Sequence, residues 1–194
     1  MIALYILLAV IAVIVLLLAI CLVRTVTVKP TSAVSAQIPK ADEKRSMDYG
    51  KSLSKLVQIE TISSRFDESR DKFYRFHEAL EEMFPLIHKH LEKHVFNGSL
   101  LFKWEGKSHK DPILLMSHHD VVEASGEWEH PPFSGEIANG AVWGRGTVDT
   151  KASLFCFLTA VEELLAQGFT PDCDIYLASS CTEEWSGEGA PLTV

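Results

Sequence analysis

The apolar run at the N-terminus constrains the fold of this chain more than any other feature. Residues 2–23 contain neither a charged residue nor a proline. At about 1.5 Å per residue they form a helix of roughly 33 Å, which is enough to cross a hydrocarbon core of about 30 Å. A secretory signal usually has a basic region before a shorter apolar core. We therefore predict a transmembrane anchor over residues 1–23, with a cleaved signal and a buried core helix as the alternatives.

The charges beside this run bear on which side of the membrane holds the rest of the chain. Arg24, Lys29 and Lys40 follow the run, and no basic residue precedes it. The positive-inside rule then keeps the following domain in the cytoplasm. Because only a few charges carry this signal, and long domains can override it, the side of the membrane stays open.

The next stretch has the composition of a tether. Residues 24–45 combine two prolines with several small polar residues, which predicts an extended linker. The globular part is then expected over residues 46–194. The whole chain has a formal net charge of −8, so it lacks the basic footprint of a nucleic-acid-binding protein.

Local patterns predict two helices and a hairpin at the start of the globular part. Apolar residues at helical spacing mark one helix across residues 53–59 and another over residues 70–84, which Pro85 should end or kink. The pair Asn97-Gly98 predicts a hairpin, because a type I′ turn needs positive φ at both central residues. The same pair with Ser99 is also a glycosylation sequon, so the turn and the modification both remain readings of this motif.

A strand, a long helix and a second strand follow. Residues 111–118 and 172–180 read as apolar strands, and residues 150–168 read as a helix that ends at Gly168. A helix that joins two strands is typical of a βαβ unit. The predicted fold class is therefore α/β, with a mixed sheet flanked by helices.

Histidine and acidic residues follow three of the strand-like runs, which is the edge where open α/β sheets bind ligands. Nitrogen and carboxylate ligands of this kind suit Zn²⁺ or a similar divalent ion. From residue chemistry alone, solvated strand ends remain the alternative. The residues are His118, His119, Asp120, Asp149, Glu183 and Glu184.

The spacing within two of these clusters suggests separate roles. Of two adjacent glutamates, one can bind a metal while its neighbour accepts a proton from a metal-activated water. An aspartate two residues after a histidine can hold the second imidazole nitrogen and fix the tautomer. These roles would fall to Glu183-Glu184 and to His118 with Asp120.

Four ordered motifs resemble one known family. They are HxDVV at 118–122, W…PPFSG at 128–135, GRGTVDTK at 144–151 and EEWSGEGA at 183–190. Together they are similar to the aminoacylase/carboxypeptidase metallopeptidases, which include aminoacylase-1, carboxypeptidase S and the N-fatty-acyl-amino-acid hydrolases. The resemblance runs from about Tyr49 to the last residue. It implies a zinc-peptidase-like fold, incomplete in this chain and preceded by the transmembrane helix.

The resemblance also implies a role for each matching residue. His118 corresponds to a ligand of the first zinc, and Asp120 to the aspartate that orients it. Asp149 corresponds to the carboxylate that bridges two zinc ions. Glu183 corresponds to the general base, and Glu184 to a ligand of the second zinc.

Further details follow from the same resemblance. The peptide bond between Asp149 and Thr150 is expected to be cis, and His119 occupies a variable position and is expected not to bind metal. The family often has an aspartate where this chain has Thr182, and an aspartate or methionine where it has Thr150. None of these departures replaces a metal ligand.

The implied activity is hydrolysis of an amide or peptide bond by a water that two zinc ions activate, with Glu183 as general base. Family substrates are N-acyl amino acids or small peptides with a free C-terminal carboxylate. The family also has two further metal ligands and a dimerisation domain later in a longer chain. We therefore expect this sequence to be the N-terminal portion of such an enzyme, which could form a homodimer through that domain. A truncated, inactive homologue that binds metal weakly is the alternative.

Several residues outside these clusters have two readings each. Arg145 could contact a substrate carboxylate or simply belong to a flexible turn. Trp128 and Phe133 could pack the long loop or form the wall of a pocket. A second metal site and a solvated helix end are the two readings of His88, His90 and His94.

Overall fold

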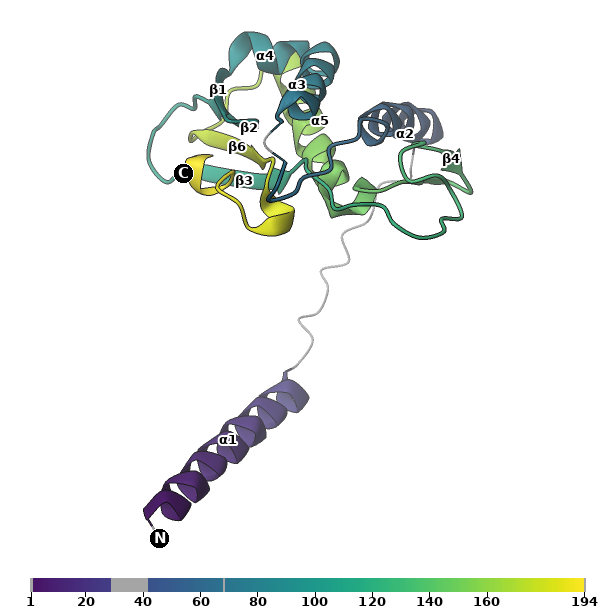
Figure 1. The fold of residues 1–194 in the computed structure, drawn as a ribbon. Helices are drawn as coiled ribbons and strands as arrows, with labels where there is room; N and C mark the ends of the chain where they lie inside the picture. Colours follow the sequence, from purple (N-terminus) through teal and green to yellow (C-terminus); the bar gives the residue numbers. More distant parts are fainter. Residues whose placement is uncertain (1, 29–41, 68, 194) are drawn as a thin grey trace. The chain divides into compact units, whose positions relative to one another are not determined.

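The structure is a computed structural model that describes residues 2–28, 42–67 and 69–193. It divides into two units, Met1–Ala41 and Asp42–Val194, which are described separately here (Figure 1). Most of the predicted linker, residues 29–41, lies outside the described residues.

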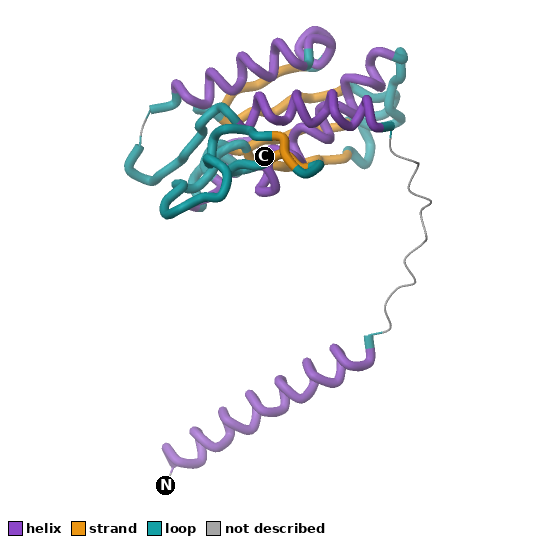
Figure 2. The backbone as a smooth tube through the Cα atoms, turned by 90° about the vertical axis from the view of Figure 1, so that its right-hand side faces the viewer, coloured by secondary structure: helices purple, strands orange, loops and turns teal. Residues whose placement is uncertain are grey.

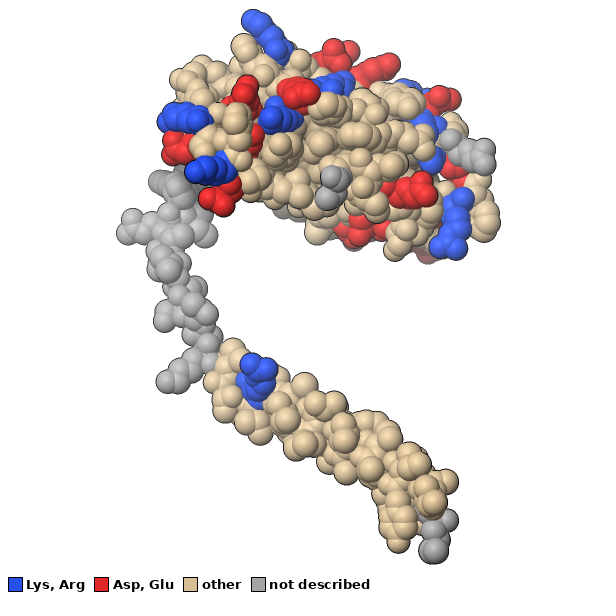
Figure 3. Space-filling view, turned by 90° about the vertical axis from the view of Figure 1, so that its left-hand side faces the viewer, with Lys and Arg blue, Asp and Glu red and all other residues tan. Residues whose placement is uncertain are grey.

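The first unit contains one long helix, α1, over Ile2–Thr27, in which no residue is buried. Its most apolar window has a mean hydropathy of 3.6, so the helix is long and apolar enough to cross a membrane. Its surface carries no charge except at the last turn, where Arg24 lies (Figure 3). The helix extends four residues beyond the predicted end at residue 23, and its full exposure speaks against a buried core helix.

Four strands form the main sheet of the second unit, in the order β1-β2-β6-β3 (Figure 1). Strand β2 is antiparallel to both β1 and β6, while β3 and β6 are parallel. This mixed sheet confirms the predicted fold class. The strands are β1 (Glu92–Phe96), β2 (Ser99–Trp104), β3 (Ile113–His118) and β6 (Ile175–Ser180).

The predicted hairpin joins β1 to β2. Asn97 and Gly98 both have positive φ, 48° and 97°, as a type I′ turn requires. Phe96 pairs with Ser99 directly across the turn. The hairpin is therefore confirmed, and glycosylation of Asn97 remains the alternative reading of this motif.

The predicted βαβ unit is also confirmed. Strand β3 leads through α5 (Ala152–Ala166) to the parallel strand β6. Gly168 follows the helix with a φ of 70°, and its backbone N–H donates to the carbonyl of Leu165. This left-handed residue ends the helix where the sequence predicted.

Three further helices precede the sheet: α2 (Glu43–Val57), α3 (Asp71–Met83) and α4 (Pro85–His90). The side chain of Asp42 caps α2 by accepting a hydrogen bond from the backbone N–H of Arg45, which is a favourable N-cap. Helix α2 thus begins three residues before the predicted domain start at 46. Pro85 separates α3 from α4, because its ring is tolerated only in a first helical turn.

The core lies between the four helices of the second unit and one face of the sheet. Alternate residues of β2 are buried on that face, as the two-residue period of a strand requires. Figure 2 shows the helices running alongside the strands. Fully or almost fully buried members of this core are Leu56, Phe76, Leu80, Ile87, Leu100, Phe102, Leu158 and Leu177.

Strand β3 is less buried than its apolar sequence predicted. Ile113, Leu114, Leu115 and Met116 are 47%, 45%, 37% and 52% exposed. Successive strand residues point to opposite faces, so both faces of β3 are open to solvent. The reason is its place in the sheet, because within the described residues no strand pairs with its outer edge.

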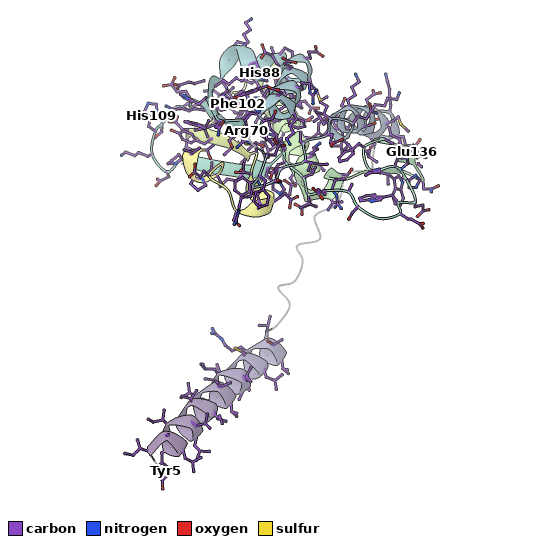
Figure 4. All side chains as sticks on the ribbon, viewed as in Figure 1. Tyr5, Arg70, His88, Phe102, His109 and Glu136 are labelled. Atoms are coloured by element: carbon purple, nitrogen blue, oxygen red, sulfur yellow. The ribbon has the colours of Figure 1, made fainter. Side chains whose placement is uncertain are left out.

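The histidines of the proposed second metal site are spread over different elements. His88 lies in α4, where its Nδ1 bonds to the carbonyl of Phe84 at 2.9 Å. Its ring packs edge-on against Phe102 at a centroid distance of 5.1 Å (Figure 4). The exposed His94 lies in β1 beside Glu92. The packing of His88, which neither reading anticipated, and the exposure of His94 both favour the reading without a second metal site.

Candidate functional site

The predicted site residues converge at the carboxyl ends of β3 and β6. His118 is the last residue of β3, and its side chain is only 8% exposed. Glu183 and Glu184 begin a short 3₁₀ turn that follows β6 after two residues. Because β3 and β6 are parallel neighbours, their ends meet at one edge of the sheet, which is where open α/β sheets bind ligands.

Asp120 connects the two strand ends. Its carboxylate accepts hydrogen bonds from the backbone N–H groups of Glu183 and Glu184, each at 3.2 Å, and from the hydroxyl of Ser63 at 2.6 Å. The Nδ1 atom of His118 lies 3.4 Å from the same carboxylate and 3.1 Å from the Asp120 carbonyl oxygen. Asp120 is completely buried. It therefore fixes both the imidazole and the backbone of the paired glutamates.

The orientation of His118 leaves one ring nitrogen free for other contacts. With Nδ1–H donating toward Asp120, Nε2 faces the acidic residues of the site. Nε2 lies 3.0 Å from Oδ1 of Asp149 and 3.5 Å from Oε2 of Glu183. This is the arrangement that a carboxylate–histidine–metal relay uses, in which the aspartate sets the tautomer of the ligand.

Asp149 reaches this edge from a distorted turn, Thr147–Lys151, just before α5. The Asp149–Thr150 peptide bond is cis, as the family resemblance implied. The Thr150 hydroxyl donates to the carbonyl of His118 at 3.0 Å, which ties the turn to the end of β3. Thr150 therefore has a structural contact of its own at a position where the family often has another residue.

Gly146 allows the turn to pass close to Val121, in the segment that follows β3. Its φ is 80°, and a Cβ atom there would lie 2.4 Å from Cγ1 of Val121. A larger residue would therefore need both a strained backbone and a shift of Val121. This close approach explains the second glycine of the GRG motif, Gly146.

Thr182, the other departure from the family pattern, also has a clear structural role. Its buried hydroxyl accepts a hydrogen bond from the backbone N–H of Gly189 at 2.8 Å. Its carbonyl oxygen accepts a second from the N–H of Gly187. Thr182 thereby closes the loop that carries Glu183 and Glu184.

The site has a buried part and an exposed part. The Asp149 and Glu183 side chains are 71% and 55% exposed, in contrast to His118 and Asp120. Burial alone would lower the pKa of His118, but its hydrogen bond to Asp120 and the nearby negative charges raise the pKa to about 9. Burial raises the pKa of Glu184, and the charges of Asp149, Asp120 and Glu183 raise it further. The carboxylates thus repel one another and attract positive charge.

Three of the predicted ligands can meet at a single ion. One ligand atom from each of His118, Asp149 and Glu184 can be chosen so that all three lie within 4.8 Å of one another. One imidazole nitrogen and two carboxylate oxygens form a donor set that suits Zn²⁺ and related divalent ions. The residues present therefore fit a metal ion.

His119 lies outside this cluster. It is fully buried, with Nδ1 2.8 Å from the Ser179 hydroxyl and Nε2 3.1 Å from the Gly98 carbonyl oxygen. Its ring stacks on Phe76. Burial lowers its pKa to about 3, so it is a neutral core residue, as expected for the variable position of the motif.

Sequence reasoning missed two residues that hold the site together. Ser63 bonds to Asp120 from a segment that pairs with the chain just after β3, through a bridge between Ile62 and Val121. Lys151 is fully buried, and its ammonium group donates to the carbonyls of Leu56 and Ile59 at the end of α2. Burial lowers the pKa of Lys151 to about 7. Ser63 belongs to no motif, and although Lys151 ends the GRGTVDTK motif, nothing in the sequence indicated its contacts with Leu56 and Ile59.

Known proteins resemble the chain at the level of sequence. A family model described as "Peptidase family M20/M25/M40" matches residues 114–194. Carboxypeptidase S-like 2 of Dictyostelium discoideum, described as probable, is 39% identical over 76% of this chain and 30% of its own length. Carboxypeptidase S of Saccharomyces cerevisiae is 42% identical over 59% of this chain and 21% of its own length.

A third relative is the N-fatty-acyl-amino acid synthase/hydrolase PM20D1 of Xenopus tropicalis, which is 34% identical over 89% of this chain and 36% of its own length. The chain therefore spans about a third or less of the length of these relatives.

Solved structures share the fold. The M20 family metallo-carboxypeptidase Sso-CP2 from Sulfolobus solfataricus superimposes with a TM-score of 0.58 at 22% identity, over 71% of this chain and 31% of its own. The dipeptidase Dug1p from Saccharomyces cerevisiae gives a TM-score of 0.57 at 22% identity, over 75% of this chain and 34% of its own.

Proposed function

Residues 114–194 of the chain belong to peptidase family M20/M25/M40, and from this premise we propose that the protein is a metal-dependent amidohydrolase. The reaction proposed is hydrolysis of an amide or peptide bond. The substrates proposed are N-acyl amino acids or small peptides with a free C-terminal carboxylate. The single observation that carries the proposal is the convergence of His118, Asp149 and Glu184 beside a base-like carboxylate, Glu183.

We assign His118, Asp149 and Glu184 to metal binding, with two zinc ions as the proposed cofactor. In this assignment Asp149 would help to hold both ions, since a carboxylate has two oxygens that can serve as ligands. Bound zinc would polarise the substrate carbonyl and lower the pKa of a water molecule. The protein's own contribution is to hold the ligands, through the hydrogen bond from His118 toward Asp120 and through the Thr150 contact to β3.

Glu183 is the proposed general base. Its Oε2 lies 3.5 Å from Nε2 of His118, so it stands next to the proposed metal ligands without being required as one. Its backbone is fixed by the hydrogen bond to Asp120, while its side chain is 55% exposed and can reach substrate. We assign it to accept a proton from the attacking water and to donate that proton to the leaving amine nitrogen.

The substrate class rests on the relatives together with this site. One relative is a carboxypeptidase and another is described as acting on N-fatty-acyl amino acids. Both descriptions share an amide bond beside an amino-acid carboxylate. The exposed side of the site, at Asp149 and Glu183, leaves room for such a substrate to approach.

Replacement of Glu183 tests the assignment of the base. Glu183→Gln keeps the shape of the side chain but cannot accept a proton, so hydrolysis of N-acyl amino acids should fall by about 10²–10⁴-fold. Zinc affinity, measured by calorimetry, should stay within about threefold, because this side chain is not assigned as a ligand. Glu188→Gln, at an exposed position in the same loop, is the matched control and should retain activity.

The measurement also separates the proposal from its alternative. Hydrolysis by the chain, or by a longer form of the protein that contains it, supports the enzyme. A folded protein that binds zinc only weakly and hydrolyses none of the substrates would instead be the inactive homologue. Full activity in Glu183→Gln would overturn the role given to the base.

We also propose that residues 1–23 anchor the protein, that residues 24–45 link the anchor to the rest, and that residues 46–194 form part of the catalytic domain. The length of α1, 26 residues, and the lack of charge before Arg24 favour an anchor over a cleaved signal, whose apolar core is shorter. An anchored protein stays with membranes after alkaline extraction and keeps its N-terminal residues in an intact-mass measurement. A mature protein that lacks them would contradict the anchor.

A further inference from the structure

An open pocket with apolar walls lies at the end of the globular unit that holds the small hairpin β4 (Ile137–Ala138) and β5 (Ala141–Val142). Its volume is about 580 Å³, within the range of about 300–1,000 Å³ that is usual for small-molecule sites. Figure 4 labels Glu136 at this end of the unit, close to β4 in Figure 1. The residues that line this pocket include Trp128, His130, Val142, Trp143, Thr147 and Val148.

The two tryptophans are held in place by hydrogen bonds. The indole N–H of Trp143 donates to the carbonyl of Ala138 at 3.0 Å, and the indole N–H of Trp128 donates to the carbonyl of Ser125 at 3.1 Å. The guanidinium group of Arg145 lies 4.8 Å from the centre of the Trp128 ring. These contacts fix the apolar faces of the wall without occupying the pocket, which supports the wall reading of Trp128.

The pocket is adjacent to the proposed metal site along the chain. Thr147 and Val148 line it, and Asp149 follows directly. The Val148 side chain is 86% exposed. An aliphatic side chain in water gains free energy when a ligand covers it. Because Val148 and Asp149 are consecutive residues, their Cα atoms lie about 3.8 Å apart, so a substituent that extends from an amide at Asp149 would be within reach of the pocket wall.

Two buried polar atoms belong to residues of the same wall. Nε2 of His130 and Oγ1 of Thr147 have no hydrogen-bond partner among the described residues. His130 is otherwise well fixed, with its Nδ1 2.9 Å from a carboxylate oxygen of Glu136 and its ring 4.3 Å from that of Trp143. Apolar walls with a few polar atoms are typical of small-molecule sites.

We propose that this Trp128–Trp143 pocket binds an apolar substituent of the substrate, next to the scissile amide, and that Val148 helps to select it. The proposal rests on the proposed function, because it takes Asp149 as part of the reacting centre. The group expected in the pocket is an apolar chain or ring that is part of an N-acyl amino acid. The substituent can belong to the acyl group or to the amino-acid side chain, and the experiment distinguishes these two sources.

Photolabelling of the whole chain tests the proposal without requiring activity. One probe is an N-acyl amino acid with a diazirine at the end of a long acyl chain, and the other is an N-acetyl amino acid with a diazirine in its side chain. Labelled residues are identified by mass spectrometry. We expect labelling concentrated in residues 127–148 by at least one probe, and the probe that labels them identifies the source of the substituent.

Two substitutions in the pocket and one outside it test whether the labelling depends on the pocket residues. Val148→Asp places a charge at an 86% exposed position, so the fold should be retained while labelling of residues 127–148 falls by about tenfold or more. Val95→Asp makes the same change at a 45% exposed position in β1, outside the pocket, and should label as the unmodified protein does. Trp128→Leu is a second pocket variant and should also reduce labelling.

The outcomes distinguish this proposal from the proposed function. Labelling spread evenly over the surface, confined to α1, or unchanged in both Val148→Asp and Trp128→Leu would overturn the pocket, whether or not the protein hydrolyses amides. Labelling of the pocket in a protein that binds zinc but hydrolyses no N-acyl amino acid would support the pocket as a binding site and count against the enzyme.

Discussion

His118 and His119 are neighbours in the sequence, yet they lie in opposite environments. His118 faces Asp149 and Glu183 at the edge of the sheet, with Asp120 behind it. His119 points the other way, into a fully buried position against Phe76. The reason is the alternation of side chains at the end of a strand, which sends successive residues to opposite sides.

The two environments favour different protonation states of the two imidazoles, the positively charged form of His118 and the neutral form of His119. Carboxylates around His118 outweigh its burial and raise its pKa to about 9, whereas burial lowers the pKa of His119 to about 3. A histidine near several carboxylates can exchange its proton for a metal ion, while a neutral core histidine serves packing and hydrogen bonding. The comparison teaches that the position along the strand, and not the residue type, separates a ligand from a core residue.

Replacement of Asp120 should have the largest effect on stability, because its buried carboxylate holds both His118 and the backbone of the paired glutamates in place. Asp120→Ala leaves the backbone N–H groups of Glu183 and Glu184 without their buried acceptor and removes the carboxylate 3.4 Å from Nδ1 of His118, while the Asp120 carbonyl next to that nitrogen remains. Loss of one partner of a buried charged network costs about 3–5 kcal/mol of unfolding free energy. Loss of the residue that orients a metal ligand should weaken zinc binding by about 10–100-fold. Chemical denaturation and calorimetry measure the two effects.

Asp120→Asn is the matched control, since it keeps one carbonyl acceptor and most of the volume. It should recover part of the stability but less of the zinc affinity, because it lacks the negative charge. An Asp120→Ala protein with wild-type stability and affinity would show that the buried network does not organise the site.

Replacing His119 and His118 one at a time should give more selective effects, the first mainly on stability and the second mainly on zinc affinity. His119→Phe keeps a ring against Phe76 but loses the hydrogen bonds to Ser179 and Gly98, so unfolding free energy should fall by about 1–3 kcal/mol. Zinc affinity should change by no more than about threefold. In His118→Ala, zinc affinity should instead fall by more than about 100-fold, which exceeds the usual effect of replacing a residue that only orients a metal ligand. If both variants changed zinc affinity equally, the assignment of ligand and core roles would be wrong.

The pH dependence of the unfolding free energy should show the smallest effect. It tests whether the buried histidines around His119 are neutral in the folded protein. His77 packs edge-on to His119 and shares its acceptor, the Gly98 carbonyl. Burial lowers the pKa of His77 from 6.5 to about 4, with smaller contributions from Lys93 and His88. Between these pKa values the unfolded chain binds a proton that the folded chain does not, so stability falls as the pH falls.

The expected loss from His77 is about 2 kcal/mol of unfolding free energy between pH 7 and pH 5. Denaturation curves of the protein and of His77→Gln at both pH values measure it, because glutamine can still donate to Gly98 but does not titrate. Equal pH dependence in the two proteins would mean that His77 is not held neutral by the fold.

The sequence predicted most of the local structure because short-range rules decide it. Turn chemistry at Asn97-Gly98 and the strand–helix–strand order needed no knowledge of distant segments. The placement of His118 and Glu184 at one edge also followed, since parallel strands bring their carboxyl ends together. The strand-like run expected before Asp149 is not a strand of this sheet, and Asp149 reaches the edge from the turn Thr147–Lys151.

Features that depend on distant neighbours could not be predicted in the same way. The exposure of Leu114 and Met116 depends on whether another strand pairs beyond β3, which a strand's own sequence does not specify. The four donors around Asp120 come from three separate segments, and Ser63 belongs to none of the motifs. Burial of Lys151 against the end of α2 is likewise a tertiary contact.

Zinc binding by the chain, compared with binding by Asp149→Ala, tests the central claim most directly. Asp149 is 71% exposed, so its replacement should change unfolding free energy by no more than about 0.5 kcal/mol. The account predicts that the unmodified protein binds zinc and that Asp149→Ala, while equally stable, binds it at least about 100-fold more weakly. Equal zinc affinity in the two proteins, or no binding by a folded unmodified chain, would contradict the metal site.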